Sequence, residues 1–359
     1  MRVCWVLTDL SGGGAERLPL RLAPALTRAA LEIVLLKDRV EHDVPSGVTV
    51  RTLGPARRSL ASGAPRLVAG LRHAARGADL VVGGLELDAT CFAVACAALA
   101  RRPVVAVVHT DLERTYAHFR LPGAQWWVYG RALAACRRVV AVSPEALAAA
   151  RRLGVPDERL VEIPNPAPPA PLAARSPRVA GQPFRLLAVG RLVPEKAHDL
   201  LLDALARVAD RSISLTLLGD GPLRAALEGQ AASLGLGGRV RFAGFVRDPA
   251  PEMARAHAWV LTSPAEGLPL ALLEAMQAGL PILSTRCGRA VEGLLEGEPT
   301  AGVLVDAGDA AALAAAIDAL AADEPRAAAL GAAGRERVRP FTPDALAPRW
   351  EQVFEEAVR

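Results

Sequence analysis

Two glutamates eight residues apart flank the start of an apolar helix, and they are the residues of this chain best placed to do chemistry. Glu266 precedes the helix and Glu274 lies within it. Proline suits a first helical turn and glycine an exit, so the sequence predicts a helix from Pro269 to Ala278 that stops at Gly279. Unpaired N–H groups and the positive dipole end at a helix N-terminus suit a diphosphate, whereas carboxylates accept hydrogen bonds from sugar hydroxyls. The stretch therefore indicates a nucleotide sugar as the ligand.

A second element places two cations directly after a β-rich run. The run, residues 185–189, leads through Gly190 into Arg191 and Lys196, and an amphipathic helix over about 197–209 follows. The chain has 42 Lys and Arg residues, but Lys196 is one of only two lysines. A compact ammonium beside a forked guanidinium suits a pyrophosphate. A solvated turn with incidental charge is the alternative interpretation of this element.

These two elements belong to a series of short motifs that extends over nearly the whole chain. In chain order the motifs are Ser11 to Arg17, Val107 to Thr110, Val142 to Pro144, Ile163 to Asn165, Val189 to Arg191 with Lys196, Gly219 to Leu223, Gly244 to Val246, and Glu266 with Glu274. In these motifs the chain resembles the retaining GT-B glycosyltransferases of glycosyltransferase family 4. The glutamate pair together with the Gly-Arg and Lys element is the specific part, whereas a glycine run alone is a common pattern.

The resemblance implies a site as well as a fold. The implied catalytic residues are His109, Glu266, Arg191 and Lys196. The implied donor-binding residues are Gly13, Gly14, Gly190, Arg191, Lys196, Gly219, Phe245, Val246, Glu266, Gly267, Leu268, Pro269, Leu270 and Glu274. Glu16 and Arg17 are expected on the acceptor side. By the same resemblance Glu266 would hold hydroxyls of the transferred sugar, Glu274 the ribose, and His109 would lie beside the primary hydroxyl of the sugar.

The positions of His109 and the glycine run can also be judged from the residues themselves. His109 follows the apolar run Val104 to Val108, so we expect it at the carboxyl end of a strand, with a capping or packing role as the alternative. In a dinucleotide-binding fingerprint starting at Gly12 and Gly14, the third glycine would fall at Arg17. The pattern is incomplete, which argues against a dehydrogenase.

The chain departs from the usual pattern of the family in two loops. Prolines follow Asn165 where the family usually has glycine, so the hinge there would differ. Cys287, Gly288 and Arg289 come after Thr285 where the family usually has a glycine pair, so the loop near the donor sugar would differ as well.

No metal or other cofactor is expected. The sequence contains no Asp-X-Asp motif and no His, Cys or carboxylate cluster with the spacing of metal ligands. We therefore expect Arg191, Lys196 and a helix dipole to neutralise the leaving diphosphate. The five cysteines are scattered and odd in number, which favours reduced core residues in a cytoplasmic protein.

The alternation of apolar strands with helical runs predicts an α/β protein, which the resemblance makes a GT-B fold of two doubly wound Rossmann-like domains facing across a cleft. The expected strands cover residues 2–7, 32–36, 48–53, 79–82, 103–108, 138–142 and 160–163, then 185–189, 214–218, 239–242, 258–262, 281–284 and 302–305. We expect an acceptor-side domain over 1–165, a proline-rich linker over 166–183 and a donor-binding domain over 184–342. By resemblance the helix 343–358 would cross back onto the first domain.

The charge of the chain is uneven along its length. Residues 1–170 carry 22 Lys and Arg against 15 Asp and Glu, a net of +7, whereas residues 171–359 carry 20 against 23, a net of −3. An anionic membrane or a phosphorylated lipid would suit the first half, although ordinary surface arginine is an equal alternative. Nucleic acid is disfavoured because no aromatic stacking run accompanies the arginines. Without an export signal or a membrane-spanning run, we expect a cytoplasmic protein with peripheral contact at the inner face of the cell membrane.

The function that the resemblance implies is a retaining hexosyltransferase, and the absence of metal-ligand motifs makes us expect it to be metal-independent. UDP-sugar is the favoured donor with GDP-mannose left open, and the acceptor would belong to a lipid-linked or surface glycan. The alternatives are a nucleotide-sugar epimerase of the same fold and a non-catalytic protein that binds nucleotide sugars.

Overall fold

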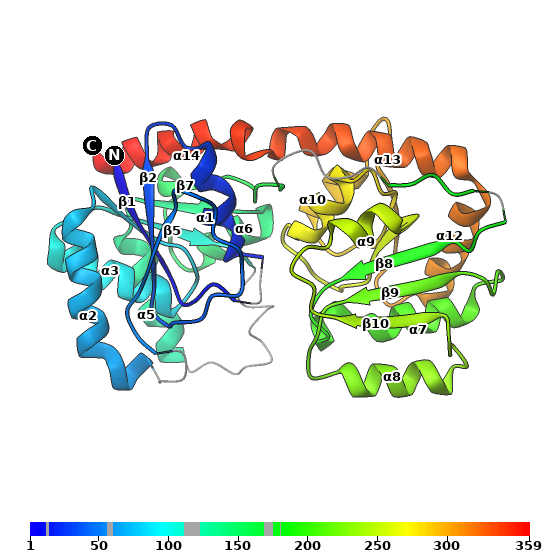
Figure 1. Ribbon diagram of the computed structural model, residues 1–359. Coiled ribbons are helices and arrows are strands. Elements are labelled where there is room, and N and C mark those ends of the chain that lie inside the picture. Colours follow the sequence, from blue (N-terminus) through cyan, green and yellow to red (C-terminus); the bar gives the residue numbers. More distant parts are fainter. Residues whose placement is uncertain (12–13, 56–59, 111–122, 169–174, 180) are drawn as a thin grey trace. The chain divides into compact units, whose positions relative to one another are not determined.

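The computed structural model describes residues 1–359 except 12–13, 56–59, 111–122, 169–174 and 180 (Figure 1). The described residues form two compact units. Unit 1 comprises Met1–Pro166 and Phe341–Arg359, and unit 2 comprises Ala167–Pro340.

Unit 1 is built on a seven-stranded sheet in which every neighbouring pair of strands is parallel. The strands are β1 (Arg2–Leu7), β2 (Ala30–Leu35), β3 (Thr49–Thr52), β4 (Leu80–Gly83), β5 (Val104–Val108), β6 (Arg138–Ala141) and β7 (Leu160–Glu162), in the order β3-β2-β1-β4-β5-β6-β7. In β1, Cys4 and Val6 pack into one hydrophobic core while Trp5 and Leu7 pack into another. Successive side chains of a strand point to opposite faces, so the sheet is buried on both sides.

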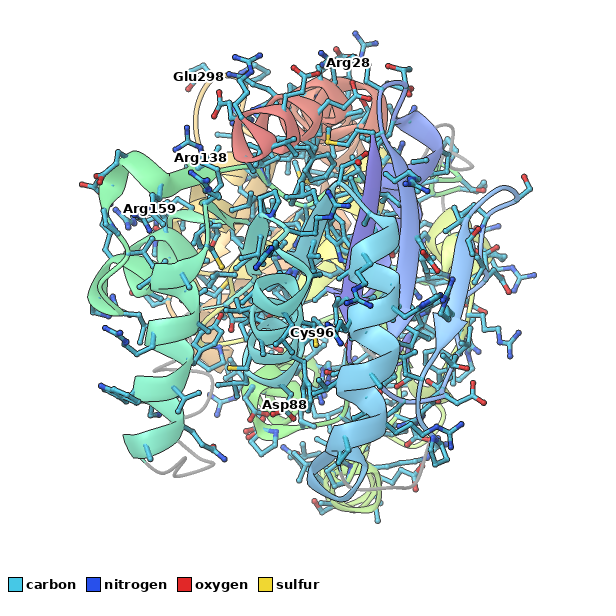
Figure 2. All side chains as sticks on the ribbon, turned by 90° about the vertical axis from the view of Figure 1, so that its left-hand side faces the viewer. Arg28, Asp88, Cys96, Arg138, Arg159 and Glu298 are labelled. Atoms are coloured by element: carbon cyan, nitrogen blue, oxygen red, sulfur yellow. The ribbon has the colours of Figure 1, made fainter. Side chains whose placement is uncertain are left out.

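Helices pack on both faces of the unit 1 sheet and complete these two hydrophobic cores. One face of the sheet packs against α2 (Leu60–Gly77), α3 (Asp88–Ala100), α5 (Gly123–Ala135) and α6 (Pro144–Arg152), and the other against α1 (Arg17–Leu22) and α14 (Pro343–Val358). α2 and α3 lie side by side, and the thiol of Cys96 on α3 donates to the carbonyl of Val68 on α2 over 3.8 Å (Figure 2). The last helix of the chain is therefore part of unit 1.

Aromatic packing and a buried carboxylate fix α14 to unit 1. The Trp350 ring lies 5.3 Å from the Trp5 ring, and Phe354 meets Trp5 edge-on. Glu351 accepts hydrogen bonds from the backbone N–H groups of Thr27 and Arg28 and from the Arg28 guanidinium. Arg28 is labelled beside this helix in Figure 2.

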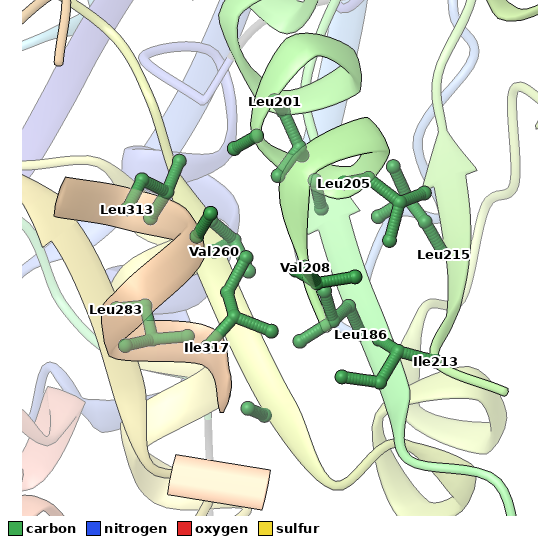
Figure 3. Packing of buried hydrophobic residues seen from close by; sticks show 14 of the residues in the cluster. Leu186, Leu201, Leu205, Val208, Ile213, Leu215, Val260, Leu283, Leu313 and Ile317 are labelled. Atoms are coloured by element: carbon green, nitrogen blue, oxygen red, sulfur yellow. The ribbon is translucent and has the colours of Figure 1, made fainter. Parts of the chain in front are cut away.

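Unit 2 is built on a six-stranded sheet, again with parallel neighbours throughout. The strands are β8 (Arg185–Val189), β9 (Ser214–Leu218), β10 (Val240–Gly244), β11 (Ala258–Leu261), β12 (Ile282–Thr285) and β13 (Gly302–Val305), in the order β10-β9-β8-β11-β12-β13. The helices are α7 (His198–Arg207), α8 (Arg224–Ser233), α9 (Ala250–Arg255), α10 (Leu270–Gln277), α11 (Arg289–Leu295), α12 (Ala310–Ala322) and α13 (Glu324–Val338). Leu201 and Leu205 of α7 and Leu313 and Ile317 of α12 form the core on one face (Figure 3).

Short 3-10 turns connect several of these elements. They are η1 (Ala23–Ala25), η3 (Asp157–Arg159), η4 (Pro194–Lys196) and η5 (Arg339–Phe341).

The strand order determines where each unit can hold a ligand. In unit 1 the order reverses between β1 and β4, and in unit 2 it reverses between β8 and β11. Ligands of open parallel sheets bind at the carboxyl ends of the strands beside such a reversal. In unit 2 the loops at this point are the two that the sequence singled out.

The structure confirms the expected α/β class with two parallel sheets, and it shortens two of the expected helices. α10 begins at Leu270, so Pro269 is its N-cap and not a residue of its first turn. The helix expected over 197–209 is α7, which is shorter at both ends. It ends at Arg207 because Val208 leaves the helical region with ψ 142°, and at its start η4 precedes it and Ala197 adopts a left-handed conformation with φ 44°. A non-glycine residue in that conformation interrupts the helical hydrogen bonds, and the helix starts after it.

Candidate functional site

An ion pair lies at the centre of the candidate site in unit 2. The Lys196 ammonium lies 2.5 Å from Glu266 Oε1, and the Ser263 hydroxyl donates to the same oxygen over 2.6 Å. The side chains of Lys196 and Glu266 are 24% and 14% exposed, so the pair is largely shielded but still reached by solvent. The structure therefore brings together two residues that the sequence assigned to different parts of one ligand.

Loops from the two strands beside the reversal hold this pair in place. Lys196 ends η4, which follows β8, and Glu266 lies in the loop after β11. The hydroxyl of Thr262 donates to the carbonyl of Lys196 over 3.0 Å, and the hydroxyl of Thr285 donates to the carbonyl of Ser263 over 2.6 Å. These hydroxyls link β8, β11 and β12 at their carboxyl ends.

The loop that departs from the family pattern also supports Glu266. The N–H of Glu266 donates to the carbonyl of Cys287 over 2.7 Å. Burial, followed by the nearby Glu266 carboxylate, raises the pKa of the Cys287 thiol to about 12, so this cysteine stays protonated. Its contribution to the site comes from its backbone, not from a reactive thiolate.

Glycines allow two loops of unit 2 to approach each other at backbone distance. A Cβ on Gly219 would lie 1.9 Å from the carbonyl oxygen of Gly190, and Gly219 has φ 138°, which favours glycine. A Cβ on Gly221 would lie 2.4 Å from the carbonyl oxygen of Leu192. The strand end that carries Arg191 is thus packed directly against the loop after β9.

α10 places the second glutamate in the core. Glu274 is 4% exposed, and its neighbours Leu272, Leu273 and Met276 are buried completely. A buried carboxylate must be hydrogen-bonded, so Glu274 is not a residue of a solvated helix face.

A glycine turn ends α10 as the sequence predicted. The N–H of Gly279 donates to Met276 and that of Leu280 to Ala275, a Schellman motif with Gly279 at φ 74°.

The remaining donor-side residues differ in burial. Arg191 is exposed, and its guanidinium forms no hydrogen bond or ion pair with any other residue that the structure describes. Phe245, after β10, is 46% exposed, whereas Val246 is half-buried. Leu268 and Leu270 are buried, and Gly267 and Pro269 are half-buried. An exposed guanidinium near a shielded ammonium offers two kinds of cation to one anionic ligand.

His198 is a site neighbour that the sequence reasoning missed. It opens α7 next to Lys196 and is 6% exposed. Burial and the neighbouring Lys196 charge lower the pKa of its imidazole to about 4. The side chain is therefore neutral near pH 7, and the only signal in the sequence was its position two residues after Lys196.

In unit 1, His109 lies where the sequence predicted, at the carboxyl end of β5. It is 6% exposed, and its Nε2 atom lies 2.9 Å from the carbonyl oxygen of Gly84. Glu86, which the sequence reasoning did not single out, accepts hydrogen bonds from the N–H groups of His109 and Thr110 over 2.6 and 3.1 Å. Its signal was an acidic residue just past the neighbouring strand β4.

The glycine-run residues are only partly described. Gly13 lies outside the described residues, whereas Gly14 is exposed and its carbonyl accepts from the N–H of Arg17 over 3.1 Å. Glu16 and Arg17 are half-buried at the start of α1.

Metal-ligand clusters and membrane-spanning helices are both absent from the described residues. They contain no group of three or more His, Cys, Asp or Glu side chains arranged to hold a metal ion. No helix in this part of the chain combines the length and the apolar character of a membrane-spanning segment.

Two protein families match the chain in its two halves. Residues 12–170 match the family described as Glycosyltransferase Family 4, and residues 183–323 match the family described as Glycosyl transferases group 1. Together the two matches include every residue named above for the candidate site.

Individual relatives match part of the chain. The lipopolysaccharide core biosynthesis glycosyltransferase LpsE of Rhizobium meliloti is 36% identical over 170 residues, which is 47% of this chain and 49% of that protein. A GDP-mannose-dependent α-(1-6)-phosphatidylinositol monomannoside mannosyltransferase of Mycolicibacterium smegmatis is 36% identical over 163 residues, 42% of each chain. The chain thus spans about half the length or less of these relatives.

Solved structures match over the full length. HepE of Anabaena in complex with UDP and glucose superposes with a TM-score of 0.83 over 99% of both chains, at 23% identity. WaaG, a glycosyltransferase involved in lipopolysaccharide biosynthesis, gives a TM-score of 0.74 over 98% of this chain and 99% of its own, at 18% identity. These likenesses confirm the fold that the sequence predicted.

Proposed function

The chain belongs to the group 1, family 4 glycosyltransferases of GT-B fold, and from its site we propose that it transfers a sugar from a nucleoside diphosphate donor to an acceptor hydroxyl. The observation that carries the proposal is the contact between Lys196 and Glu266 at the strand reversal of unit 2. The buried Glu274 follows on α10. A site for a nucleotide sugar needs a cation that binds the phosphates and carboxylates that bind the hydroxyls, and these residues provide both.

We assign the donor contacts by charge. Lys196 and Arg191 bind the diphosphate, Glu274 the ribose, and Glu266 the hydroxyls of the transferred sugar. Since the Lys196 ammonium pairs with Glu266, a bound diphosphate acts as a second anion on that ammonium. The charge that builds on the departing phosphate is stabilised by these fixed cations and needs no metal ion.

The reaction proceeds with retention of anomeric configuration and without a covalent glycosyl intermediate on the protein. The acceptor hydroxyl attacks on the face from which the diphosphate leaves, and a phosphate oxygen takes its proton. The protein contributes positioning and charge stabilisation. His109 contributes a contact to the primary hydroxyl of the transferred hexose.

For the donor we propose a UDP-sugar, and for the acceptor a lipid-linked or surface glycan. The bound UDP and glucose in the HepE structure support the nucleotide, while the GDP-mannose-dependent relative makes GDP-mannose the principal competitor. The lipopolysaccharide core relative supports the acceptor class.

We also propose that unit 1 recognises the acceptor and contacts anionic membrane at the inner face of the cell membrane. On α5, Trp127 and Val128 are 69% and 47% exposed, and the Arg131 guanidinium lies 6.0 Å over the Trp127 ring. An exposed tryptophan beside a cation suits an anionic lipid interface. Sedimentation with vesicles of anionic lipid should fall on Trp127→Ala, and sedimentation that does not depend on anionic lipid would refute this part.

A donor panel tests the central proposal. UDP-, GDP- and ADP-sugars are screened by thermal shift, because a ligand that binds the folded state raises its stability. Transfer and hydrolysis are then measured for the donors that bind. Release of nucleoside diphosphate without transfer would favour an epimerase, and binding without turnover would favour a binding protein.

Substitution of the two site cations tests the proposed contacts to the donor diphosphate. Lys196→Met and Arg191→Met should each weaken donor binding about tenfold or more, because a charge-assisted contact contributes about 1.5 to 3 kcal/mol. Arg207→Met, which removes an exposed cation at the far end of α7, is the control. Wild-type activity abolished by EDTA, or donor affinity unchanged in both site variants, would contradict the proposed metal-free clamp.

A further inference from the structure

Glu86 makes a contact that the proposed reaction has not used. It follows β4, and one of its carboxylate oxygens accepts hydrogen bonds from two successive N–H groups, those of His109 and Thr110. Those two N–H groups lie just beyond Val108, the last residue of β5 that pairs with β6. A carboxylate that accepts two backbone N–H groups fixes the conformation of the segment that carries them.

The turn that carries Glu86 is tightly fixed on its other side. The N–H of Gly84 donates to the carbonyl of Val6 over 2.9 Å, and a Cβ on Gly84 would lie 2.0 Å from the Trp5 indole nitrogen. The hydroxyl of Thr90 donates to the carbonyl of Leu85 over 2.6 Å. The turn can therefore serve as a rigid base for the Glu86 side chain.

Leu87 shows that this turn has an unusual backbone. Its φ of 55° and ψ of −109° lie in a region that non-glycine residues rarely occupy. Strained backbone of this kind costs about 1 to 3 kcal/mol and persists only where the surroundings enforce it. The strain directly follows Glu86, in the loop between β4 and α3, and β4 is one of the two strands at the order reversal of unit 1.

The contacts of His109 also define which ring nitrogen carries the proton. Nε2 faces the carbonyl oxygen of Gly84, which can only accept, so Nε2 carries the hydrogen. Nδ1 of the neutral ring is then an acceptor. It is buried, and it has no hydrogen-bond partner among the described residues. An acceptor of this kind suits a ligand hydroxyl and does not suit a phosphate oxygen.

We propose that Glu86 is a positioning residue that, through the backbone of His109, holds the ring with Nε2–H on Gly84 and Nδ1 available to accept from the primary hydroxyl of the donor sugar. Its functional consequence rests on the proposed glycosyl transfer, whereas the effect on the ring can be measured without turnover. Glu86 acts on the transferred sugar only through His109.

Nitrogen NMR of the full chain tests the positioning directly. With ¹⁵N-labelled histidine, wild type should show His109 as the Nε2–H tautomer, and Glu86→Ala should shift it to a mixture of tautomers. Asp88→Ala, which removes an exposed carboxylate two residues away, is the control and should leave the tautomer unchanged. If the His109 signals of Glu86→Ala match those of wild type, the proposal is wrong whether or not the protein is a transferase.

Kinetics with paired donors tests the consequence. The donors are a nucleoside diphosphate hexose and its 6-deoxy analogue, which lacks the primary hydroxyl. Wild type should prefer the hexose in kcat/KM, and Glu86→Ala and His109→Ala should each reduce that preference about tenfold. The double variant should reduce the preference for the hexose no more than either single variant does, because both substitutions act on one contact.

The outcomes separate the two proposals. If Glu86→Ala lowers kcat/KM equally for both donors, Glu86 has only a structural role, and the positioning role is overturned. If Glu86→Ala does not fold, Glu86→Gln, which keeps an acceptor oxygen but loses the charge, should show the same change of preference in weaker form. Failure of wild type to turn over any donor would refute the proposed function alone, since the tautomer measurement still decides the role of Glu86.

Discussion

In the proposed donor complex, Glu266 can contact either the Lys196 ammonium or a sugar hydroxyl. Lys196 can likewise contact either Glu266 or a phosphate. In the structure the two side chains contact each other over 2.5 Å. An ion pair that a ligand must share makes the two residues energetically coupled, so a change in one is expected to alter the affinity of the other.

The coupling predicts opposite effects of Glu266→Gln on binding and turnover. The variant should bind free nucleoside diphosphate as tightly as wild type or more tightly, because it releases Lys196 for the phosphate. Its kcat should fall about tenfold or more, because the lost contacts to the sugar strengthen as the bond breaks. Calorimetric titration of the diphosphate and single-turnover rates measure the two quantities.

An exposed carboxylate provides the control for this prediction. Glu336→Gln removes a charge from α13, where Glu336 pairs with Arg339 at the surface, and should change neither quantity. Loss of nucleotide affinity in proportion to kcat in Glu266→Gln would place Glu266 on the nucleotide and contradict its assignment to the sugar.

At this scale the sequence predicted which residues gather but not how they contact each other. The strand ends of 185–189 and 258–262 had to meet at one edge of a parallel sheet, which brings Lys196 and Glu266 together. The ion pair between them depends on rotamers and on the Ser263 hydroxyl, which spacing does not specify. Glu86 was missed because its acceptor role depends on two N–H groups that are 23 and 24 residues away in the chain.

Among the elements, the strands were the most predictable from the sequence. Each of the thirteen expected strands is present. The central strands, such as β4, β5, β11 and β12, were the clearest, because a strand buried on both faces requires a short, nearly continuous apolar run. The end of α10 was equally clear, since only glycine adopts the φ of 74° at Gly279 without strain. The start of α7 was not, because nothing marks Ala197 as a residue with positive φ.

The attachment of α14 to unit 1 makes a prediction for stability. Trp350 is fully buried and packs against Trp5 with their ring centroids 5.3 Å apart, so Trp350→Ala should lower the free energy of unfolding of unit 1 by about 3 to 5 kcal/mol. Denaturant titration followed by circular dichroism measures the change.

A second tryptophan of the same unit is the matched control. Trp127 is 69% exposed, and Trp127→Ala should change the stability by no more than about 0.5 kcal/mol. A loss in Trp350→Ala no larger than in this control would mean that α14 is dispensable for the stability of unit 1.

At the scale of the whole molecule, the two units differ in how they hold titratable groups. Unit 2 buries His198 and His257, whose pKa values are lowered to about 4, in both cases chiefly by burial and then by a nearby cation. Unit 1 buries Glu351. Burial acts to raise the pKa of Glu351, but hydrogen bonds from Arg28 and Thr27 outweigh it and hold the pKa below its usual 4.5.

These shifts predict that acid weakens unit 2 before it weakens the α14 attachment of unit 1. A histidine with a folded pKa below its unfolded value of about 6.5 stabilises the fold fully above pH 6.5, and this stabilisation is lost as the pH falls from 6.5 towards 4. For Glu351 the loss begins only as the pH falls below 4.5. Calorimetric melts of the full chain between pH 7.5 and 4.5 should therefore show the unit 2 transition moving to lower temperature.

Substitution of a buried histidine tests the cause of this acid sensitivity. His257→Gln should reduce the shift of the unit 2 transition with pH. His73 is an exposed histidine of unit 1, and His73→Gln should leave the shift unchanged. The same pH dependence in His257→Gln as in wild type would show that the buried His257 does not carry the acid sensitivity of unit 2.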